Sequence, residues 1–162
     1  MALCVRVAQS SDLAQVDALL ARAYPRLLKP DYPPSVLVTA LPLISRAQPG
    51  LVNSGTYYVA ELGKDAPIVG AGGWSRDRSD TTIGHIRHIV SDDRHVRKGV
   101  ARALLTQVFK VAAGQGVHCL HCQATRTAVP FYIAMGFETV GPIDVPLRPG
   151  ISFPAVFMTR LL

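Results

Sequence analysis

The candidate functional residues lie within residues 82–105, whose sequence predicts a strand, a charged loop and a helix. β-Branched side chains predict the strand over residues 82–90, and apolar residues at helical spacing predict a helix from Val100. The N–H groups and positive dipole end of such a helix attract anions, and a glycine lets a ligand approach the main chain. We therefore predict a phosphate or pyrophosphate site at the turn formed by Arg97, Lys98, Gly99, Val100 and Ala101.

Two familiar phosphate-binding patterns are absent from this stretch. It contains neither G-x-x-x-x-G-K-[ST] nor G-x-G-x-x-G, so it is not a P-loop or a dinucleotide fingerprint. On these residues alone, an ordinary strand–loop–helix connection with a solvated charged tip remains the alternative.

Composition and charge limit the class of protein. With 162 residues, 49% of them hydrophobic, the chain is expected to form a single globular domain over residues 1–162. The net charge of +6 favours anionic partners. No run of five Lys or Arg residues occurs, so we expect the anionic partner to be a phosphorylated cofactor and not nucleic acid. Three cysteines, no evident signal peptide and no apolar run of 18 residues predict a cytoplasmic protein without a membrane span.

One cluster superficially resembles a zinc site. His118, Cys119, His121 and Cys122 follow one another closely, but their surroundings predict a strand. Residues three apart on a strand point to opposite faces, so one ion could not reach both thiols. We predict no metal here and expect the cysteines to be small core residues.

The remaining sequence predicts the order β-α-α-β-β-β-α-β-α-β-β. The first helix is expected to end near Pro25, and a helix over residues 35–47 to be interrupted near Pro42. The glycines at 70, 72 and 73 should allow a ligand or chain to approach their strand. Residues 141–150 are predicted to be a Pro/Gly-rich loop within the last hairpin. The expected strands are 3–8, 55–62, 68–75, 82–90, 117–124, 137–140 and 153–161.

These elements predict a mixed sheet with helices on both faces, of the α/β or α+β class. Strands 55–62, 68–75 and 82–90 should form an antiparallel meander. Strand 117–124 follows a strand–helix unit, so it should pair parallel to strand 82–90 by a right-handed crossover. A short helix over residues 128–135 should begin at a Thr127 cap and end at Gly136.

A second motif follows that crossover. Residues 128–137 fit the pattern Ala-x-x-Phe/Leu-Tyr-x-x-x-Gly-Phe at every fixed position: Ala128, Phe131, Tyr132, Gly136 and Phe137. With the turn at residues 96–101, this motif resembles the GNAT N-acetyltransferase superfamily. Two positions depart from the family pattern. Val96 replaces the usual Gln or Arg, and Thr125 stands where many members carry an Asn that contacts pantetheine.

The resemblance implies a GNAT-like, mostly antiparallel sheet with one splayed parallel strand pair. The pantetheine arm of acetyl-CoA would lie between strands 82–90 and 117–124, near Ile89 and Val90. The implied cofactor-binding set is this pair, the turn at residues 97–101, and Val96, Arg102, Thr125 and Phe131. The implied reaction is direct attack of a primary amine, on an unidentified small molecule or peptide, on the thioester. No metal is implied, and a homodimer is compatible with the family.

The same resemblance implies catalytic roles. Tyr132 matches the tyrosine that protonates the leaving sulfur. His85 and His88 are candidate bases because imidazole has a suitable intrinsic pKa. They are three residues apart, so only one faces the cleft of a regular strand, although a bulge would change this. Arg87 could orient an anionic substrate.

Two other functions remain open at this point. A non-catalytic CoA-binding module would accommodate the departures at Val96 and Thr125. A basic nucleic-acid-binding domain is the third possibility. Tyr24, Tyr32, Tyr57, Tyr58 and Trp74 are candidates for the acceptor pocket, and aromatic residues in such elements are more often core.

Overall fold

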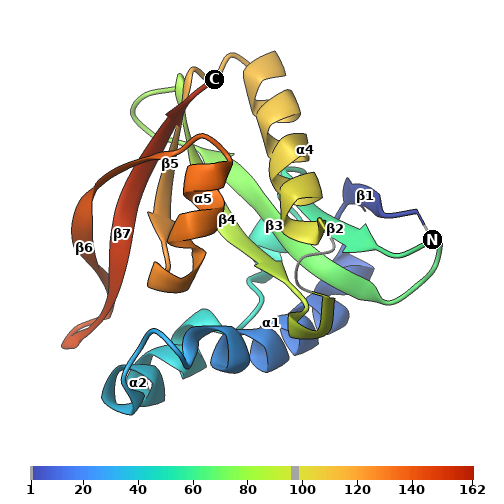
Figure 1. Cartoon of the computed structure of the whole chain (residues 1–162). Coiled ribbons are helices and arrows are strands. Elements are labelled where there is room, and N and C mark those ends of the chain that lie inside the picture. Colours follow the sequence, from blue (N-terminus) through green and yellow to red (C-terminus); the bar gives the residue numbers. More distant parts are fainter. Residues whose placement is uncertain (1, 96–98) are drawn as a thin grey trace.

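A seven-stranded sheet forms the centre of the computed structural model, which describes residues 2–95 and 99–162 (Figure 1). Its strand order is β1-β2-β3-β4-β5-β7-β6. Every neighbouring pair is antiparallel except β4 and β5, which are parallel, as the crossover predicted. The strands are β1 (Cys4–Val7), β2 (Tyr57–Glu61), β3 (Ile68–Arg76), β4 (Ile83–Ser91), β5 (Cys119–Ala124), β6 (Glu138–Arg148) and β7 (Ile151–Leu161).

Helices cover both faces of this sheet. The helices are α1 (Leu13–Leu28), α2 (Pro34–Ile44), α3 (Pro49–Val52), α4 (Val100–Gly114) and α5 (Val129–Ala134). Three 3₁₀ turns, η1 (Ser10–Asp12), η2 (Asp93–His95) and η3 (Arg126–Ala128), link them to the strands. The element order therefore confirms the predicted α/β class.

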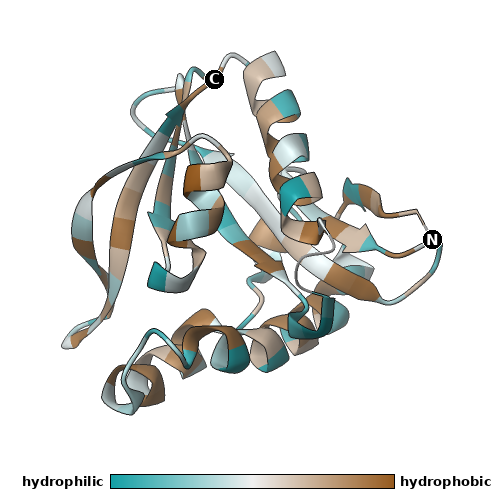
Figure 2. Cartoon of the chain, viewed as in Figure 1, coloured by the Kyte–Doolittle hydropathy of each residue, from teal (hydrophilic) through white to brown (hydrophobic). Residues whose placement is uncertain are grey.

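Separate apolar clusters fix the helices to the sheet. On one face, α4 and α5 bury Leu104, Leu105 and Tyr132 against Trp74 and Leu120. On the other face, α1 packs on β2, β3 and β4, and α2 packs on the β6–β7 hairpin. Figure 2 shows apolar and polar residues alternating along α1 and α4, as expected for helices with one face on a sheet.

Two helices continue through a proline, contrary to prediction. α1 does not end near Pro25 but runs on to Leu28, and α2 is not interrupted at Pro42. A proline inside a helix costs about 3 kcal/mol because it removes a hydrogen bond and crowds the preceding turn. Leu28 is 1% exposed, so burial of the last turn of α1 offsets that cost.

The predicted loop over residues 141–150 is wrong. β6 and β7 form a long hairpin, with Pro149 and Gly150 at its turn. Proline is tolerated in β6 because this strand lies at the sheet edge and pairs on only one side. Ile143, Val145 and Leu147 alternate along β6 and pack towards α2. This alternation was the sequence signal that the prolines obscured.

The glycines of β3 allow close approach of the chain. A Cβ atom at Gly70 would collide with Val100 Cγ1 and lie 3.1 Å from Leu104 Cδ1, so Gly70 lets the start of α4 sit on the sheet. A Cβ atom at Gly72 would lie 2.8 Å from the Cα of Ile89. The prediction of close approach is confirmed, and in both places the approaching group is protein.

Two further findings concern the chain as a whole. No helix in the described ranges is long and apolar enough to cross a membrane. The three cysteines are all unpaired, and within the described residues no group of three or more His, Cys, Asp or Glu side chains is arranged to hold a metal ion.

Candidate active site

The two parallel strands separate at the centre of the sheet. β4 and β5 pair only over residues 83–85 and 119–121, although β4 continues to Ser91 and β5 to Ala124. A cavity of about 250 Å³ lies where they part, and its walls also include residues of α1, α2, α5, β6 and β7. The splayed pair thus gives a ligand access to strand edges that have no sheet partner on this side.

A β-bulge shapes the β4 wall of this cavity. His88 and Ile89 together lie opposite the single residue Gly72, because the β3–β4 register shifts between Gly73 and Ala71. His88 has φ of 50°, a left-handed conformation that is uncommon for a residue with a side chain. Bulges of this kind re-aim side chains. Both His88 and Ile89 line the cavity.

The structure separates the two candidate histidines. His85 Nε2 lies 2.7 Å from Asp77 Oδ1, and its ring packs edge-on against His121 with centroids 5.6 Å apart. His85 is not among the residues lining the cavity, whereas His88 is. Desolvation, followed by the charge of Arg87, lowers the pKa of His88, so its imidazole is neutral near pH 7.

Tyr132 forms the opposite wall, on α5. It is 4% exposed, and its ring lies 5.3 Å from that of Phe131 and 5.1 Å from that of Phe137. Burial raises the pKa of Tyr132 well above its usual value, and the neighbouring Cys122 thiol adds to the rise. Burial also raises the pKa of Cys122 to about 12. Both groups therefore keep their protons at neutral pH.

Thr125 holds the start of the helical segment that carries Tyr132. Its Oγ1 accepts a hydrogen bond from the backbone N–H of Ala128 at 3.3 Å, and Thr125 also lines the cavity. The cap was predicted at Thr127 instead, and that prediction is wrong. Thr127 Oγ1 is buried and has no hydrogen-bond partner among the described residues.

The N-terminus of α4 has backbone donors that no hydrogen bond within the helix uses. Gly99 is the N-cap with φ of 79°, and no side chain caps the helix. The first helical hydrogen bond runs from Ala103 N to Gly99 O at 2.9 Å, so the N–H groups of Val100, Ala101 and Arg102 have no partner within the helix. The predicted contributions of Val96, Arg97 and Lys98 lie outside the described residues.

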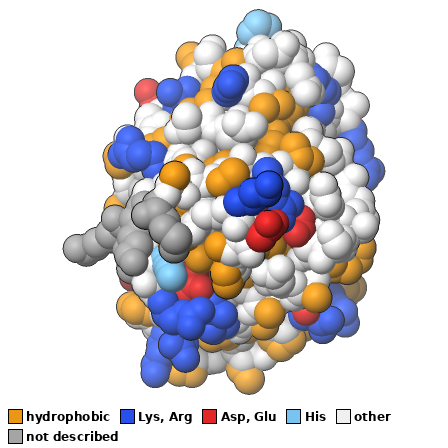
Figure 3. Space-filling model, turned by 90° about the vertical axis from the view of Figure 1, so that its right-hand side faces the viewer, with side chains coloured by type: hydrophobic (Ala, Val, Ile, Leu, Met, Phe, Trp, Pro, Cys, Tyr) orange, Lys and Arg blue, Asp and Glu red, His pale blue; other side chains and the backbone are white. Residues whose placement is uncertain are grey.

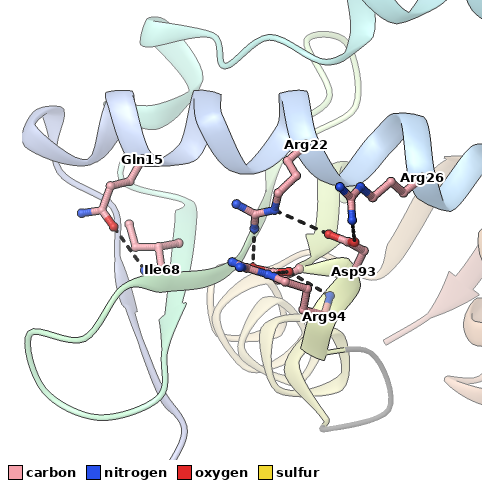
Figure 4. A network of polar contacts seen from close by, with 7 residues as sticks. Gln15, Arg22, Arg26, Ile68, Asp93 and Arg94 are labelled. Atoms are coloured by element: carbon pink, nitrogen blue, oxygen red, sulfur yellow. Dashed lines mark hydrogen bonds and ion pairs between the residues drawn. The ribbon is translucent and has the colours of Figure 1, made fainter.

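A charged network joins α1 to the segment between β4 and α4 (Figure 4). Asp92 is 1% exposed and accepts hydrogen bonds from Arg22 and from Arg94, the latter through Nε at 3.3 Å and Nη2 at 3.2 Å. Asp93 pairs with Arg26 at 3.2 Å and with Arg22 at 3.6 Å. On the face shown in Figure 3, acidic side chains lie directly beside Lys and Arg side chains. The sequence indicated a charged loop here but not the burial of Asp92.

The other predicted cofactor-binding residues lie in different places. Ile89 and Thr125 line the cavity together with His88 and Tyr132, whereas Phe131 packs on Tyr132. The Val90 side chain is buried in the cluster under α1. Of the aromatic candidates for the acceptor pocket, Tyr24 lines the cavity, while Tyr32, Tyr57, Tyr58 and Trp74 do not and are buried. No local pattern in the sequence predicted that Gln123 or side chains of the β6–β7 hairpin would line this cavity.

Comparison with known proteins agrees with this geometry. The acetyltransferase (GNAT) domain matches residues 36–153. The chain belongs to the GNAT acetyltransferase family. Its GNAT fold is similar to that of a GCN5-related N-acetyltransferase from Rhodopseudomonas palustris, with a TM-score of 0.81 and 21% identity over 100% of this chain and 97% of the other. No curated protein matches the sequence of this GNAT chain.

Two structurally similar proteins were crystallised with the coenzyme. The PaiA N-acetyltransferase from Thermoplasma acidophilum, in complex with coenzyme A, has a TM-score of 0.74 and 13% identity, and the match covers 100% of both chains. YncA, a putative acetyltransferase from Salmonella typhimurium with its cofactor acetyl-CoA, has a TM-score of 0.71 and 17% identity over 100% of this chain and 95% of that one. At these identities the likeness concerns the fold.

Proposed function

We propose that this GNAT chain is an acetyl-CoA-dependent N-acetyltransferase that acts on the primary amine of a small molecule. The observation that carries the proposal is the cavity between the splayed strands, which has His88 and Tyr132 on its walls. Family membership supports acyl transfer. The two neighbours crystallised with coenzyme A or acetyl-CoA support the identity of the donor.

The donor would lie along the splay, with its pyrophosphate at the N-terminus of α4. The N–H groups of Val100, Ala101 and Arg102, which have no partner within the helix, suit an anion, and the exposed Gly99 has no described atom within 4 Å of its Cβ position. The unpaired inner edge of β4, beyond His85, suits the amide groups of a pantetheine arm. The thioester would then reach the cavity.

The proposed chemistry is direct transfer. The amine nitrogen attacks the thioester carbonyl carbon, a C–N bond forms and the C–S bond breaks. The proton released by the amine passes to His88, directly or through water, because its lowered pKa leaves the imidazole neutral. The thiolate of coenzyme A takes the phenolic proton of Tyr132, which burial retains at neutral pH. Transfer of the proton from His88 back to Tyr132 through solvent then regenerates both side chains. The products are the acetylated amine and free coenzyme A.

We also propose a cytoplasmic location. Its support is chemical, since Cys4, Cys119 and Cys122 are all unpaired and such thiols persist in a reducing compartment.

The experiment that tests the enzymatic role is Tyr132→Phe. The change keeps the packing of a buried ring and removes only the hydroxyl, so acetyl-CoA affinity should hold while the single-turnover rate falls about 10²-fold. Tyr58→Phe is the matched control, because Tyr58 is 1% exposed in the same apolar cluster but does not line the cavity. A wild-type rate for Tyr132→Phe would refute the role. Acetyl-CoA binding without turnover of any amine would indicate a CoA-binding module instead.

A further inference from the structure

We propose that the acceptor is a small amino acid with an apolar side chain, and that Arg87 binds its carboxylate. This inference rests on the proposed function of the same cavity and narrows its substrate class.

The charge of the cavity wall argues against cationic acceptors. None of the described residues that line it is an aspartate or glutamate, and its one arginine is Arg87. A polyamine or an aminoglycoside would lose the hydration of several ammonium groups without gaining a carboxylate partner. An amine that carries its own carboxylate would instead bring a negative charge to Arg87.

Arg87 is placed to receive that carboxylate. Its strand position, two residues beyond His85, puts it on the same face of the sheet as His85. His85 pairs in register with His121 on β5, so Gln123 lies across the splay from Arg87 on that face. These two residues therefore flank the entrance to the splay on the side of the sheet that α1 and α2 cover.

The guanidinium group of Arg87 is oriented but not saturated. Its Nε donates a hydrogen bond to Ser75 Oγ at 2.8 Å, which fixes the plane of the group. Its Nη1 and Nη2 atoms have no hydrogen-bond or ion-pair partner among the described residues. A planar guanidinium with two free nitrogens matches the two oxygens of a carboxylate, whereas a lysine could offer only a point charge.

The remaining wall suits an apolar side chain of modest size. Leu43 and Ile44 of α2 face the same cavity as Val145, Leu147 and Phe153 of the β6–β7 hairpin. The volume of about 250 Å³ is below the range of roughly 300–1,000 Å³ that is usual for pockets holding drug-sized ligands. Because the acetyl end of the donor must share this space, the part of the acceptor that enters the cavity is expected to be a side chain of modest size.

Matched acceptor pairs test the carboxylate directly. Leucine and phenylalanine are compared with 3-methylbutylamine and phenethylamine, which lack only the carboxylate, and with leucinamide and spermidine. We expect kcat/KM for the amino acids to exceed that of their decarboxylated partners by at least about tenfold, the effect of one charge-assisted pair. Arg87→Gln should abolish this preference mainly through KM, and Arg87→Lys should restore part of it. Arg78→Gln, at an exposed arginine in the β3–β4 turn, is the control and should leave the preference intact.

The outcomes separate this inference from the proposed function. Equal or faster turnover of the decarboxylated amines, leucinamide or spermidine would overturn the carboxylate assignment while the enzyme remains an N-acetyltransferase. A preference that survives Arg87→Gln would overturn the role of Arg87. Calorimetry with N-acetylleucine and coenzyme A covers the case in which no amine is acetylated. If the wild type binds N-acetylleucine and Arg87→Gln does not, the ligand class is supported although the enzymatic proposal fails. If the wild type binds neither compound, the ligand class and the proposed N-acetyltransferase are both overturned.

Discussion

Asp92 gives the sharpest test of how α1 and the segment leading to α4 are held together. Its side chain is 2% exposed and accepts hydrogen bonds from Arg22 and Arg94. Asp92 also fixes the backbone at this point, since its N–H donates to Val69 O at 2.7 Å. Asp92→Asn keeps the size of the side chain and removes its charge, so the two guanidinium groups lose their shared anion.

The expected loss is about 2 kcal/mol in the free energy of unfolding at pH 7. Hydrogen bonds to charged groups contribute about 1.5–3 kcal/mol each. Water reaches both partners, because the Arg22 side chain is 34% exposed and that of Arg94 is 63% exposed, so the sum is reduced by solvent screening. Asp17→Asn is the control. Asp17 is 38% exposed and its partner Arg46 is 71% exposed, so the change should cost at most about 1 kcal/mol.

The pH dependence provides an internal check. Burial acts to raise the pKa of Asp92, but the Arg94 hydrogen bonds and the charges of Arg22 and Arg94 outweigh it and lower the pKa overall. The stabilisation is therefore complete above the unfolded-state pKa of about 4 and is lost as the pH falls through the lower folded-state value. Urea unfolding of the wild type and Asp92→Asn at pH 7 and pH 3 should show the difference shrinking in acid. Equal losses for Asp92→Asn and Asp17→Asn, or a difference independent of pH, would refute the reasoning.

Three further predictions follow from individual side chains. The kcat/KM of the wild type should rise with pH through a midpoint below 6.5, because desolvation lowers the pKa of His88. His88→Gln should remove this rise of kcat/KM with pH, and His85→Gln should keep it. If only His85→Gln lost the rise of kcat/KM with pH, the base would be His85 and not His88. Gly70→Val should destabilise the protein by about 2–3 kcal/mol in thermal unfolding, since its side chain would collide with the first turn of α4, and an unchanged melting temperature would contradict that packing. At pH 8 iodoacetamide should modify the exposed Cys4 much faster than the buried Cys122, whose pKa is about 12, and equal rates would contradict the burial.

Local sequence signals predicted the elements that position the site. The β-branched residues of β4 and the helical spacing from Val100 each act within a few residues, so the strand–turn–helix unit could be inferred directly. The crossover rule then gave the parallel pairing of β4 with β5. The bulge at His88 could be anticipated only as an alternative, because it depends on the register against β3.

Tertiary burial decided the features that the sequence did not reveal. Pro25 would end an isolated helix, but the buried Leu28 extends α1 beyond it. The prolines of β6 obscured an alternating strand that becomes favourable only against α2 and β7. From its sequence Asp92 would be assigned to the surface, but in the structure it is buried between Arg22 of α1 and Arg94. Each of these features depends on contacts between residues distant in sequence, which local patterns do not encode.

Calorimetry of acetyl-CoA with Gly99 variants tests whether the cofactor binds at the N-terminus of α4. Gly99 caps α4 with a positive φ and has open space around its Cβ position among the described residues. Gly99→Asp and Gly99→Asn carry similar backbone strain and nearly equal volume, so they differ mainly in one negative charge. If the pyrophosphate binds at this helix N-terminus, Gly99→Asp should bind acetyl-CoA at least about tenfold more weakly than Gly99→Asn, equivalent to roughly 1.4 kcal/mol of repulsion. Equal affinities for the two folded variants would contradict the placement of acetyl-CoA on which the proposed transferase rests.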